Sequence, residues 1–417
     1  MNTNNVLFDD NIIELRDSKE FMKNIVDCIP SAIFLLDNNF EIQAFNKSLE
    51  TVFSYVSNNE IIYKLVGDVI GCAHSVEEGK QCGGTSKCPG CILRNTTIGS
   101  FTSMEPIYKQ KLTRDFYTND SVKTRKHLEF STRFIEHENK GMVIVILNDI
   151  SEISEQKLKI EKQKEQIDAS IRYAENIQNA VLPLIKNLES ERYDNFILNI
   201  PKDVIGGDFY WFKQTPDKLF LTVGDCTGHG IPGALISILG ISIINSLENN
   251  IFTLSTDEFL LLLRNKLIKY LHSSEGECLM KDGMDIAYSI INFETKKLQF
   301  SGANNSLFLV RNKEIIVLPG NKIPIGHCYK GNNLFFDNHE IEIMPNDTIY
   351  LFSDGYIDQF GGLNNKKIGT NHFKDILIEI SDKPIPEQKE ILHTTFLEWK
   401  GYNTQTDDIC IVGIKIK

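Results

Sequence analysis

The segment from Asp149 to Leu182 contains neither glycine nor proline, and it divides the chain into three regions. Apolar residues recur in it at seven-residue intervals, at Ile153, Ile160, Ile167, Ala174 and Val181. Such a repeat favours a coiled coil over an isolated helix. The second seam that a coiled coil needs is weak, because lysines occupy two of its positions, Lys157 and Lys164. We therefore predict a helical coiled-coil linker over residues 149–184 that makes the protein a homodimer, with a single amphipathic helix lying on one domain as the alternative.

The composition is that of a globular protein with more than one domain. The chain has 417 residues, of which 41% are hydrophobic and 24% are charged. This is enough apolar material for separate folded cores. The net charge of −12 argues against nucleic acid as a partner, because a phosphate backbone is bound by a basic surface.

The first residues and the cysteines of the chain indicate where in the cell the protein is located. The first residues, Met1–Asn5, lack the basic and apolar regions of a signal peptide. The sequence has no apolar stretch long enough for a membrane span. Nine cysteines without an export signal indicate a reducing environment, where thiols and metal ligands are more common than disulfides. We therefore expect a cytoplasmic protein without a membrane span.

The first region, residues 18–148, has the pattern of a small α/β domain. A helix is predicted over residues 18–28, followed by the apolar strands Ala32–Leu36 and Glu41–Phe45 on either side of a turn. Two more strand-like segments, residues 128–134 and 141–147, close the region.

The third region, residues 191–417, mixes hairpins with two helical stretches at residues 231–247 and 257–270. The predicted strands are residues 284–293, 298–301, 307–310, 315–318, 341–344, 348–353 and 409–416. Strands that follow one another in hairpins form antiparallel sheets, and here the helices are segregated from them. The expected fold class is therefore α+β rather than a doubly wound parallel sheet.

Two aspartates stand at the ends of a predicted hairpin in this region. Asp208 precedes one apolar strand and Asp225 follows the next, with Pro216 and Asp217 as the turn between them. With this turn, cross-strand partners have residue numbers that sum to 433, which places the two aspartates opposite each other on one face. Two facing carboxylates repel each other unless a cation lies between them. A one-residue slip of the turn would put them on opposite faces.

Further aspartates occupy the ends of other predicted strands, namely Asp354, Asp407 and Asp408. A single aspartate at a strand end is usually a turn residue, but four such sites in one domain suggest a shared role. Carboxylates are the preferred ligands of Mg²⁺ and Mn²⁺. Two such ions held by carboxylates are suited to phosphoryl transfer to water. The loop after Asp225 reads CTGHG and leads into the helix at 231–247, whose first N–H groups are free to bind an anion.

The third region resembles the SpoIIE-like phosphatases, a bacterial branch of the metal-dependent (PPM, type 2C) serine/threonine protein phosphatases. The resemblance runs from about Ala169 to Lys417 and rests on several motifs in the same order. These motifs are VIGGDFYW at 204–211, GDCTGHGIPGA at 224–234, FSDGY at 352–356 and TDDI at 406–409, with GMD at 283–285 and SGANN at 301–305 as connecting segments. The family implies an antiparallel β-sandwich flanked by helices.

The resemblance also implies how the aspartates act. Members of the family hydrolyse phosphoserine or phosphothreonine with a water activated by two Mn²⁺ or Mg²⁺ ions. By motif position, Asp225 would bridge the ions and Cys226 would offer its backbone carbonyl. Asp354 and Asp407 would hold one ion, and Asp208 would assist at the other. Asp407 is preferred over Asp408 because it matches the first acid of the family's pair.

His229 lies in the second motif and is a candidate general acid. The eukaryotic relatives place a histidine two residues after the metal-binding aspartate, where this chain has Thr227. We therefore expect His229 to support the site structurally rather than to act in catalysis.

The first region resembles a PAS sensor domain. The resemblance rests on the early strand pair and on the segment VIVILNDISE at 143–152, which is similar to the last PAS strand and the signalling helix that follows it. Within the region, a Cys-rich insertion at 72–91 contains four cysteines, Cys72, Cys82, Cys88 and Cys91. Four thiolates suit Zn²⁺ or an iron–sulfur cluster, and His74 is a further candidate ligand. The alternative is an insertion with redox-active thiols.

Together these features predict a signal-regulated phosphatase with a PAS-like input domain. The branch implies a phosphorylated anti-sigma factor antagonist, a small STAS-type domain, as the substrate protein in partner switching. The alternatives are a redox or metal sensor whose phosphatase-like domain is a non-catalytic scaffold, and an adaptor assembled through the linker. A sensor histidine kinase is excluded, because no glycine-rich nucleotide-binding box follows the linker.

Overall fold

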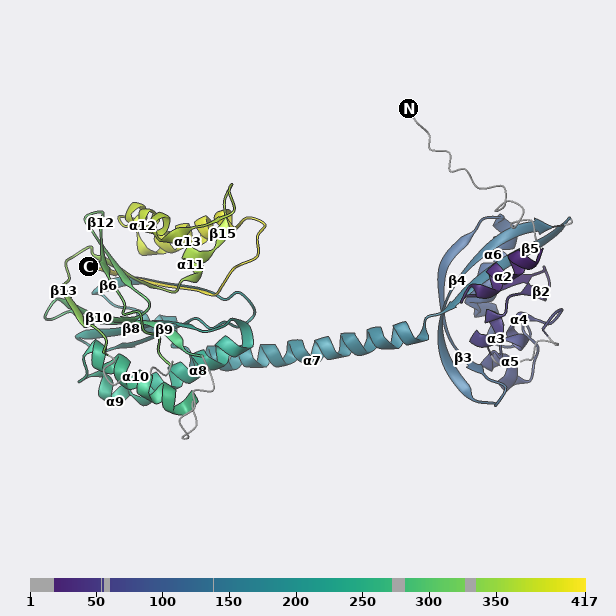
Figure 1. The fold of residues 1–417 in the computed structure, drawn as a ribbon, viewed down its shortest axis with the longest axis horizontal. Helices are drawn as coiled ribbons and strands as arrows, with labels where there is room; N and C mark the ends of the chain where they lie inside the picture. Colours follow the sequence, from purple (N-terminus) through teal and green to yellow (C-terminus); the bar gives the residue numbers. More distant parts are fainter. Residues whose placement is uncertain (1–18, 54, 56–60, 138, 272–281, 327–334) are drawn as a thin grey trace, which may run out of the picture. The chain divides into compact units, whose positions relative to one another are not determined.

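The computed structural model describes residues 19–53, 55, 61–137, 139–271, 282–326 and 335–417. By its internal contacts the chain divides into two compact units, unit 1 (residues 1–165) and unit 2 (residues 166–417). Figure 1 labels the elements of both units. In the part of the chain that is described, no helix has the length and apolar character needed to cross a membrane.

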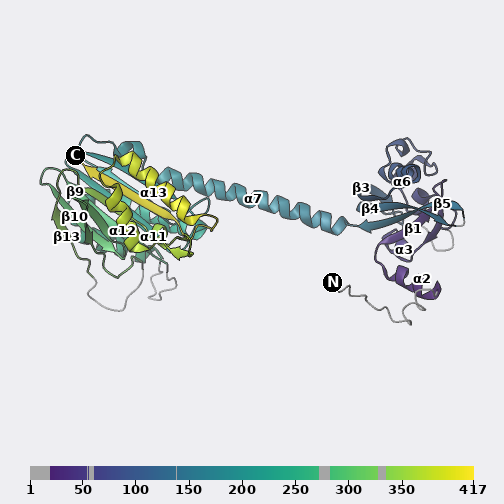
Figure 2. The same ribbon diagram turned by 90° about the horizontal axis from the view of Figure 1, so that it is seen from above.

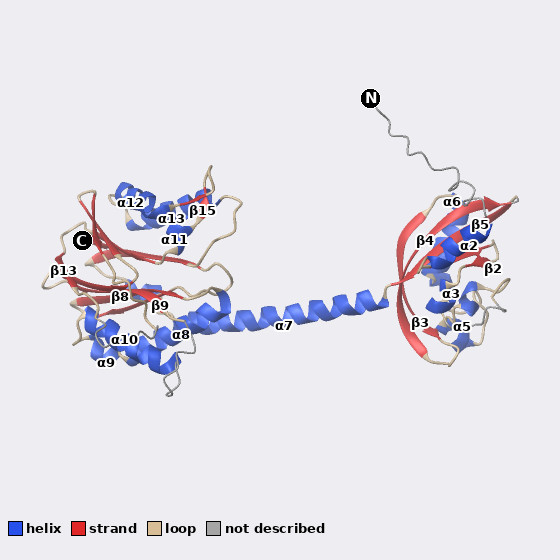
Figure 3. Cartoon of the chain, in the orientation of Figure 1, coloured by secondary structure: helices blue, strands red, loops and turns tan. Residues whose placement is uncertain are grey.

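Unit 1 is built on one five-stranded antiparallel sheet with the strand order β2-β1-β5-β4-β3. The strands are β1 (Ala32–Leu36), β2 (Ile42–Phe45), β3 (Ile107–Tyr117), β4 (Lys123–His137) and β5 (Lys140–Asp149). The helices are α2 (Lys19–Cys28), α3 (Ser48–Val52), α4 (Val66–Val69), α5 (Ala73–Glu78) and α6 (Ile92–Ser103), with a 3-10 turn η2 (Cys88–Gly90). Figure 3 shows the helices gathered on one face of the sheet.

The core of unit 1 lies between the sheet and the helices α3, α4 and α6. Along β1, Ala32, Phe34 and Leu36 are buried while the residues between them are partly exposed, as expected for a strand with one covered face. The predicted first hairpin is confirmed, and the predicted strand 141–147 is the middle of β5, which lies between β1 and β4. The strand predicted at 128–134 is part of the longer β4, because polar residues extend it at both ends.

Helix α7 (Ser151–Val181) contains the boundary between the two units. At its start, Asp149 Oδ1 accepts hydrogen bonds from the backbone N–H of Ser151 at 3.0 Å and from its hydroxyl at 2.6 Å. Three isoleucines of the seven-residue repeat, Ile153, Ile160 and Ile167, are 68%, 64% and 58% exposed. In the single chain this apolar seam is therefore open to solvent.

Unit 2 contains two five-stranded antiparallel sheets, with the orders β13-β10-β9-β8-β7 and β12-β11-β14-β17-β6. The first sheet consists of β7 (Phe209–Gln214), β8 (Lys218–Cys226), β9 (Met284–Asn292), β10 (Lys297–Ala303) and β13 (His339–Glu342). The second consists of β6 (Tyr193–Ile200), β11 (Leu307–Arg311), β12 (Glu314–Leu318), β14 (Thr348–Phe352) and β17 (Ile409–Ile416). The prediction of antiparallel sheets with segregated helices is confirmed.

Helices cover the outer face of each sheet of unit 2. Figure 1 shows α8 (Gly230–Ser246), α9 (Glu248–Ile251) and α10 (Thr256–Leu271) beside the first sheet. Figure 2 shows α12 (Gly369–Ile380) and α13 (Ile385–Lys400) lying across the second, near the short α11 (Gly355–Asp358). The remaining elements are the 3-10 turn η3 (Ile185–Leu188) and a small hairpin of β15 (Phe360–Gly361) and β16 (Lys366–Lys367).

The core of unit 2 therefore has three layers of apolar contacts. Phe212, Leu221, Leu351 and Val412 belong to the cluster between the two sheets, and two further clusters join each sheet to its own helices. Strands covered on both faces are apolar throughout, as in β14, where all five residues are buried.

The sequence pattern missed parts of this fold. Helices α12 and α13 were not predicted, although α12 buries an amphipathic face through Phe373, Leu377 and Ile380. Strand β13 begins two residues before the predicted segment 341–344, because it pairs with β10 through His339. Both features depend on tertiary packing, which decides marginal local preferences.

Candidate active site

The hairpin of β7 and β8 has the predicted register. Phe209 pairs with Gly224, and each following pair also has residue numbers that sum to 433. The turn closes with a hydrogen bond from the N–H of Thr215 to the carbonyl of Lys218 at 2.8 Å. Asp208 directly precedes this ladder and Asp225 directly follows Gly224, so both aspartates stand at the same end of the first sheet.

A third aspartate, Asp285, pairs with Asp225 across β8 and β9. Its Oδ1 accepts a hydrogen bond from Asn304 Nδ2 at 2.7 Å. From its sequence, Asp285 was recognised only as part of the connecting motif at 283–285. The long helical segment between β8 and β9 prevents the register from being counted along the chain, so the position of Asp285 opposite Asp225 was not predicted.

The second sheet brings its own acidic residues to the same place. Phe352 pairs with Ile411, so Ser353 and Asp354 after β14 lie opposite the first residues of β17. The N–H of Cys410 donates to Ser353 Oγ at 2.9 Å. Ser353 Oγ donates in turn to Asp208 Oδ2 at 2.5 Å. This hydroxyl therefore connects the acidic ends of the two sheets.

Asp407 and Asp408 have different surroundings. Asp408 is buried, and its two carboxylate oxygens accept hydrogen bonds from the backbone N–H groups of Lys202 at 2.7 Å and Gly207 at 2.6 Å. Asp407 is only partly buried, and its Oδ1 accepts the N–H of Asp408 at 2.9 Å. A Cβ on Gly206 would lie 2.5 Å from Asp408 Oδ1, so the loop before Asp208 closes tightly around the Asp408 carboxylate.

The loop after Asp225 packs against this same segment. A Cβ on Gly207 would lie 2.8 Å from the carbonyl oxygen of Gly228 and 3.0 Å from that of Cys226. The Cys226 thiol is buried, which raises its pKa well above the usual value. The side chain of Cys226 therefore belongs to the core. Its backbone carbonyl lies at the acidic end of the sheets.

His229 is half-exposed at the start of α8, and its Nδ1 lies 2.9 Å from Asp203 Oδ2. Asp203 belongs to the loop that Asp408 holds at Lys202. This contact joins the loop before Asp208 to the start of α8.

The aspartates raise each other's pKa values. Asp208 is 7% exposed, and this burial raises its pKa well above the usual range. The Ser353 hydrogen bond opposes the shift, while Asp408, Asp407 and Asp354 add to it. Burial likewise raises the pKa of Asp225, with Asp208 as the strongest charged neighbour. Desolvation raises the pKa of Asp354 to about 6, and Asp358 and Asp407 contribute.

The carboxylate oxygens of these aspartates are ligands of the kind that divalent cations prefer. The charged groups that act on Asp208 and Asp225 are other aspartates, and a carboxylate cluster of this kind is stabilised by a hard cation. Across the described residues, no three His, Cys, Asp or Glu side chains stand close enough together to hold a metal ion as they are placed. The carboxylates therefore lie at the same end of the sheets but do not converge on a single point.

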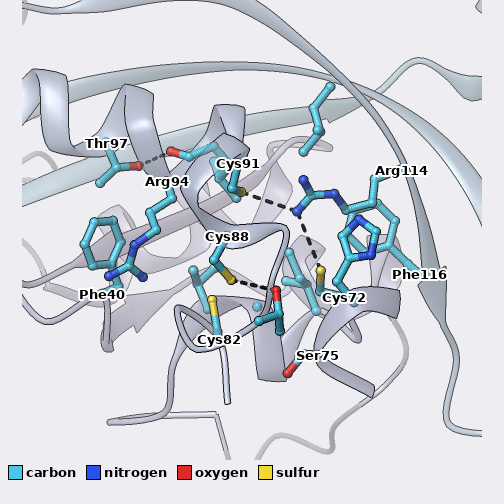
Figure 4. Close-up of a pocket in the computed structure, with 17 residues that line it drawn as sticks. Phe40, Cys72, Ser75, Cys82, Cys88, Cys91, Arg94, Thr97, Arg114 and Phe116 are labelled. Carbon is cyan, nitrogen blue, oxygen red and sulfur yellow. Dashed lines mark hydrogen bonds between the residues drawn. The ribbon is translucent and has the colours of Figure 1, made fainter. Parts of the chain in front are cut away.

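The four predicted cysteine ligands lie in unit 1, whereas these aspartates lie in unit 2. Cys72, Cys82, Cys88 and Cys91 all line one pocket, together with His74, Arg94 and Arg114. Figure 4 shows this pocket. Arg94 and Arg114 were not part of the sequence prediction, because Arg114 comes from β3, outside the Cys-rich segment.

Comparison with known proteins agrees with the geometry of unit 2. The profile of the family described as Stage II sporulation protein E (SpoIIE) matches residues 215–417, which include Asp225, Asp354 and Asp407. The structure of the SiaA-PP2C domain of Pseudomonas aeruginosa is similar at 30% sequence identity and a TM-score of 0.55, over 61% of this chain and 99% of that one. A search among curated proteins found no match.

Two further solved structures are similar at lower identity. The PP2C phosphatase domain of SpoIIE from Bacillus subtilis, with a fragment of its regulatory domain, is 13% identical over 69% of this chain and 70% of that one, with a TM-score of 0.45. A structure of RsbU and RsbW domains from Mycobacterium tuberculosis is 19% identical over 54% of this chain and 60% of that one, with a TM-score of 0.44. From the profile match and the SiaA-PP2C likeness together, the chain belongs to the SpoIIE-type PP2C family and carries a serine/threonine phosphatase domain in unit 2.

Proposed function

We propose that unit 2 hydrolyses phosphoserine or phosphothreonine in a protein substrate, with two Mn²⁺ or Mg²⁺ ions at the acidic end of its sheets. One observation carries this proposal. Burial and neighbouring carboxylates raise the pKa values of Asp208, Asp225 and Asp354, and Asp407 is among those neighbours in each case. The β7–β8 hairpin of the first sheet and strands β14 and β17 of the second thus bring carboxylates to one place, at a cost in repulsion that a structural role would not require.

Each residue has a role in this proposal. Asp225 and the Cys226 carbonyl would hold both ions, Asp354 and Asp407 would hold one of them, and Asp208 would assist at the other. When bound, the ions would activate a water for attack and offset the charge that develops on the phosphoryl oxygens. Ser353 keeps Asp208 oriented through its hydroxyl.

Asp408 and Asp285 are the remaining aspartates at this end of the sheets. Both oxygens of Asp408 are already used by backbone N–H groups, so we assign it to holding the loop at Gly206 and Gly207 rather than to the metal. Asp285 faces Asp225 and is a further candidate ligand, held by Asn304.

We propose that unit 1 is a PAS-like input domain and that the substrate is a STAS-type anti-sigma factor antagonist. The antiparallel sheet, with its first hairpin at β1–β2 and its last strand leading into a long helix, supports the first part. The motifs shared with the SpoIIE branch support the second. The exposed seam at Ile153, Ile160 and Ile167 supports a homodimer in which α7 pairs with the α7 of a second copy.

Helix α7 offers a route by which its packing could affect the site. Gln178 is 8% exposed, and its Nε2 donates to the carbonyl of Gly206 at 2.7 Å and to Ser237 Oγ on α8 at 2.9 Å. A shift of the last turns of α7 would therefore act on the loop before Asp208 and on the helix after Asp225 together.

Phosphate release tests the proposed activity. The full-length protein is incubated with Mn²⁺ and a phosphoserine-bearing STAS-domain protein, and the Asp225→Asn variant is compared with Asp217→Asn. Asp217 lies in the turn of the same hairpin, about 26 Å along β8 from Asp225. We expect metal-dependent turnover in the wild type and in Asp217→Asn, and a loss of at least about 100-fold in Asp225→Asn.

The outcome also separates the two functions that the sequence left open. Bound Mn²⁺ without turnover on any phosphoserine protein or peptide would favour the non-catalytic scaffold. Turnover that survives Asp225→Asn would contradict the assignment of the aspartates.

A further inference from the structure

The thiol groups of Cys72, Cys82, Cys88 and Cys91 meet in one pocket of unit 1, although they come from separate local elements. Cys72 directly precedes α5 and Cys91 directly precedes α6, while Cys88 begins η2 and Cys82 lies in the loop between. All four are free thiols and all four line the pocket. Figure 4 shows their sulfur atoms turned toward its interior. These cysteines belong to unit 1, whereas the proposed phosphatase site belongs to unit 2.

We propose that these four cysteines bind an iron–sulfur cluster. Clusters of the [2Fe–2S] and [4Fe–4S] types are commonly held by four cysteine thiolates, with hydrogen bonds to the sulfurs and burial setting their properties.

The pocket supplies positive charge and hydrogen-bond donors to the sulfurs. Arg114 Nη1 donates to Cys91 Sγ at 3.3 Å and to Cys72 Sγ at 3.6 Å. Cys88 Sγ accepts the N–H of Gly83 at 3.2 Å and lies 3.0 Å from Thr85 Oγ1. Four thiolates around a cluster core leave a net negative charge, which a guanidinium among them offsets. N–H and O–H groups that point at sulfur are the surroundings that stabilise a thiolate ligand.

A second arginine also lines the pocket. The Arg94 guanidinium lies over the Phe40 ring at 4.1 Å from its centroid, which fixes the charge on an apolar wall. The rest of the wall is mainly apolar and includes Ile70, Leu93, Leu112 and Phe116. Such a lining limits the access of water and oxygen to a bound cluster.

The placement of the four thiols around one pocket suits a cluster. Zinc draws its four ligands around one atom, with each Zn–S bond about 2.3 Å long. The four cysteines surround a pocket. A cluster places several iron and sulfide atoms between its ligands, so that it suits thiols that face a common space without touching a common point.

The backbone around Cys82 is held in a way that keeps its thiol at the pocket. Asp68 Oδ1 accepts the N–H of Cys82 at 2.9 Å. Ser75 Oγ donates to the carbonyl of Lys80 at 2.6 Å. A Cβ on Gly67 would lie 2.5 Å from Cys82 Sγ. The absence of a side chain at Gly67 therefore makes the room that the Cys82 sulfur occupies.

Iron and sulfide analysis of the full-length protein tests the proposal. The protein is purified without oxygen, and a second sample is reconstituted with ferrous iron and sulfide. Iron, acid-labile sulfide and zinc are then measured, together with the visible absorption and the electron paramagnetic resonance spectrum after reduction with dithionite. We expect iron and sulfide in nearly equal amounts, with the broad visible absorption of a cluster.

Three variants locate the cluster. Cys88→Ala should lose most of the iron, and Cys28→Ala should keep it, because Cys28 is an exposed cysteine on α2 outside the pocket. Gly67→Ala removes no ligand but displaces the Cys82 sulfur, and we expect its cluster to be lost to a chelator about tenfold faster. Circular dichroism identifies any variant that has failed to fold.

The wild-type protein alone can show whether a cluster is bound. A reconstituted protein that remains colourless, or that holds one zinc per chain, overturns the proposal. So does a cluster that Cys88→Ala retains in full. Because the readouts are metal content and spectra rather than turnover, the result is independent of the phosphatase activity proposed for unit 2.

Discussion

Gln178 of helix α7 donates from Nε2 to the backbone carbonyl of Gly206 at 2.7 Å, two residues before Asp208. The same nitrogen donates to Ser237 on α8. At the other end of α7, Asp149 accepts hydrogen bonds from Ser151 and Lys126. The helix is therefore fastened to unit 1 by its first turn and to the proposed catalytic loop by its last turns.

Removal of the Gln178 side chain should weaken unit 2 and its activity together. Gln178→Ala leaves the Gly206 carbonyl and the Ser237 hydroxyl without this donor, which should lower the free energy of unfolding by about 1–3 kcal/mol. Turnover should fall because the loop before Asp208 loses its support. Asn179→Ala, an exposed neighbour on the same helix, is the matched control. Urea denaturation followed by tryptophan fluorescence measures unit 2, since both tryptophans, Trp211 and Trp399, lie in it. Unchanged stability and turnover in Gln178→Ala would contradict the coupling.

The start of α7 should depend on pH through Asp149. Burial alone would raise the pKa of Asp149, but hydrogen bonds from Lys126 and Ser151 outweigh it and hold the pKa below the usual 3.8. Since the folded-state pKa is lowered, the carboxylate stabilises unit 1 at neutral pH, and this contribution is lost as the pH falls through the folded-state pKa.

Asp149→Asn should therefore destabilise the first turn of α7 at pH 7, by less than about 1 kcal/mol because the pair is partly exposed to solvent. The difference from the wild type should shrink toward pH 3. Hydrogen exchange in β4 and the first turn of α7, compared between the two proteins at each pH, measures it. A difference that stays constant from pH 7 to pH 3 would show that the charge of Asp149 has no role.

Substitution of Asp407 should affect catalysis, whereas substitution of Asp408 should affect stability. Asp408→Ala leaves the N–H groups of Lys202 and Gly207 without their acceptor, so the free energy of unfolding should fall by about 1–3 kcal/mol. Asp407→Ala should change stability by less than about 1 kcal/mol yet abolish metal-dependent turnover. Urea denaturation and phosphate release on both variants test this division. The reverse pattern, a stable and inactive Asp408→Ala with an active Asp407→Ala, would exchange their roles.

The seam on α7 should hold two copies of the chain together. Ile160→Lys places a charge in the seam and should raise the dimer dissociation constant at least about tenfold. Leu158→Lys makes the same chemical change at a position that is also exposed but lies off the seam, and it should leave the dimer intact. Sedimentation velocity over a range of concentrations measures both. A wild-type protein that stays monomeric at high concentration would contradict the proposed homodimer.

Short-range geometry could be predicted from the sequence. The two-residue turn at Pro216 and Asp217 determines the register of β7 and β8, so the opposition of Asp208 and Asp225 could be counted residue by residue. The apolar runs predicted the antiparallel strands, because strands covered on both faces are continuously hydrophobic.

Contacts between distant segments could not be predicted in this way. The hydrogen bond from Ser353 to Asp208 depends on how two sheets stack. Asp285 faces Asp225 only after the segment between β8 and β9 has folded. Arg114 reaches the cysteines from β3, which lies outside their sequence cluster. In each case the partner is set by tertiary packing, which no local pattern encodes.

We expect the aspartates at the end of the two sheets to bind the metal ions used for phosphate hydrolysis. Isothermal titration calorimetry of Mn²⁺ into the full-length protein tests it most directly, with Asp225→Asn and the turn variant Asp217→Asn measured alongside. We expect two Mn²⁺ ions per chain attributable to unit 2 in the wild type and in Asp217→Asn, and a loss of at least about tenfold in affinity in Asp225→Asn. Equal Mn²⁺ binding by the wild type and Asp225→Asn would contradict the assignment of the aspartates as metal ligands.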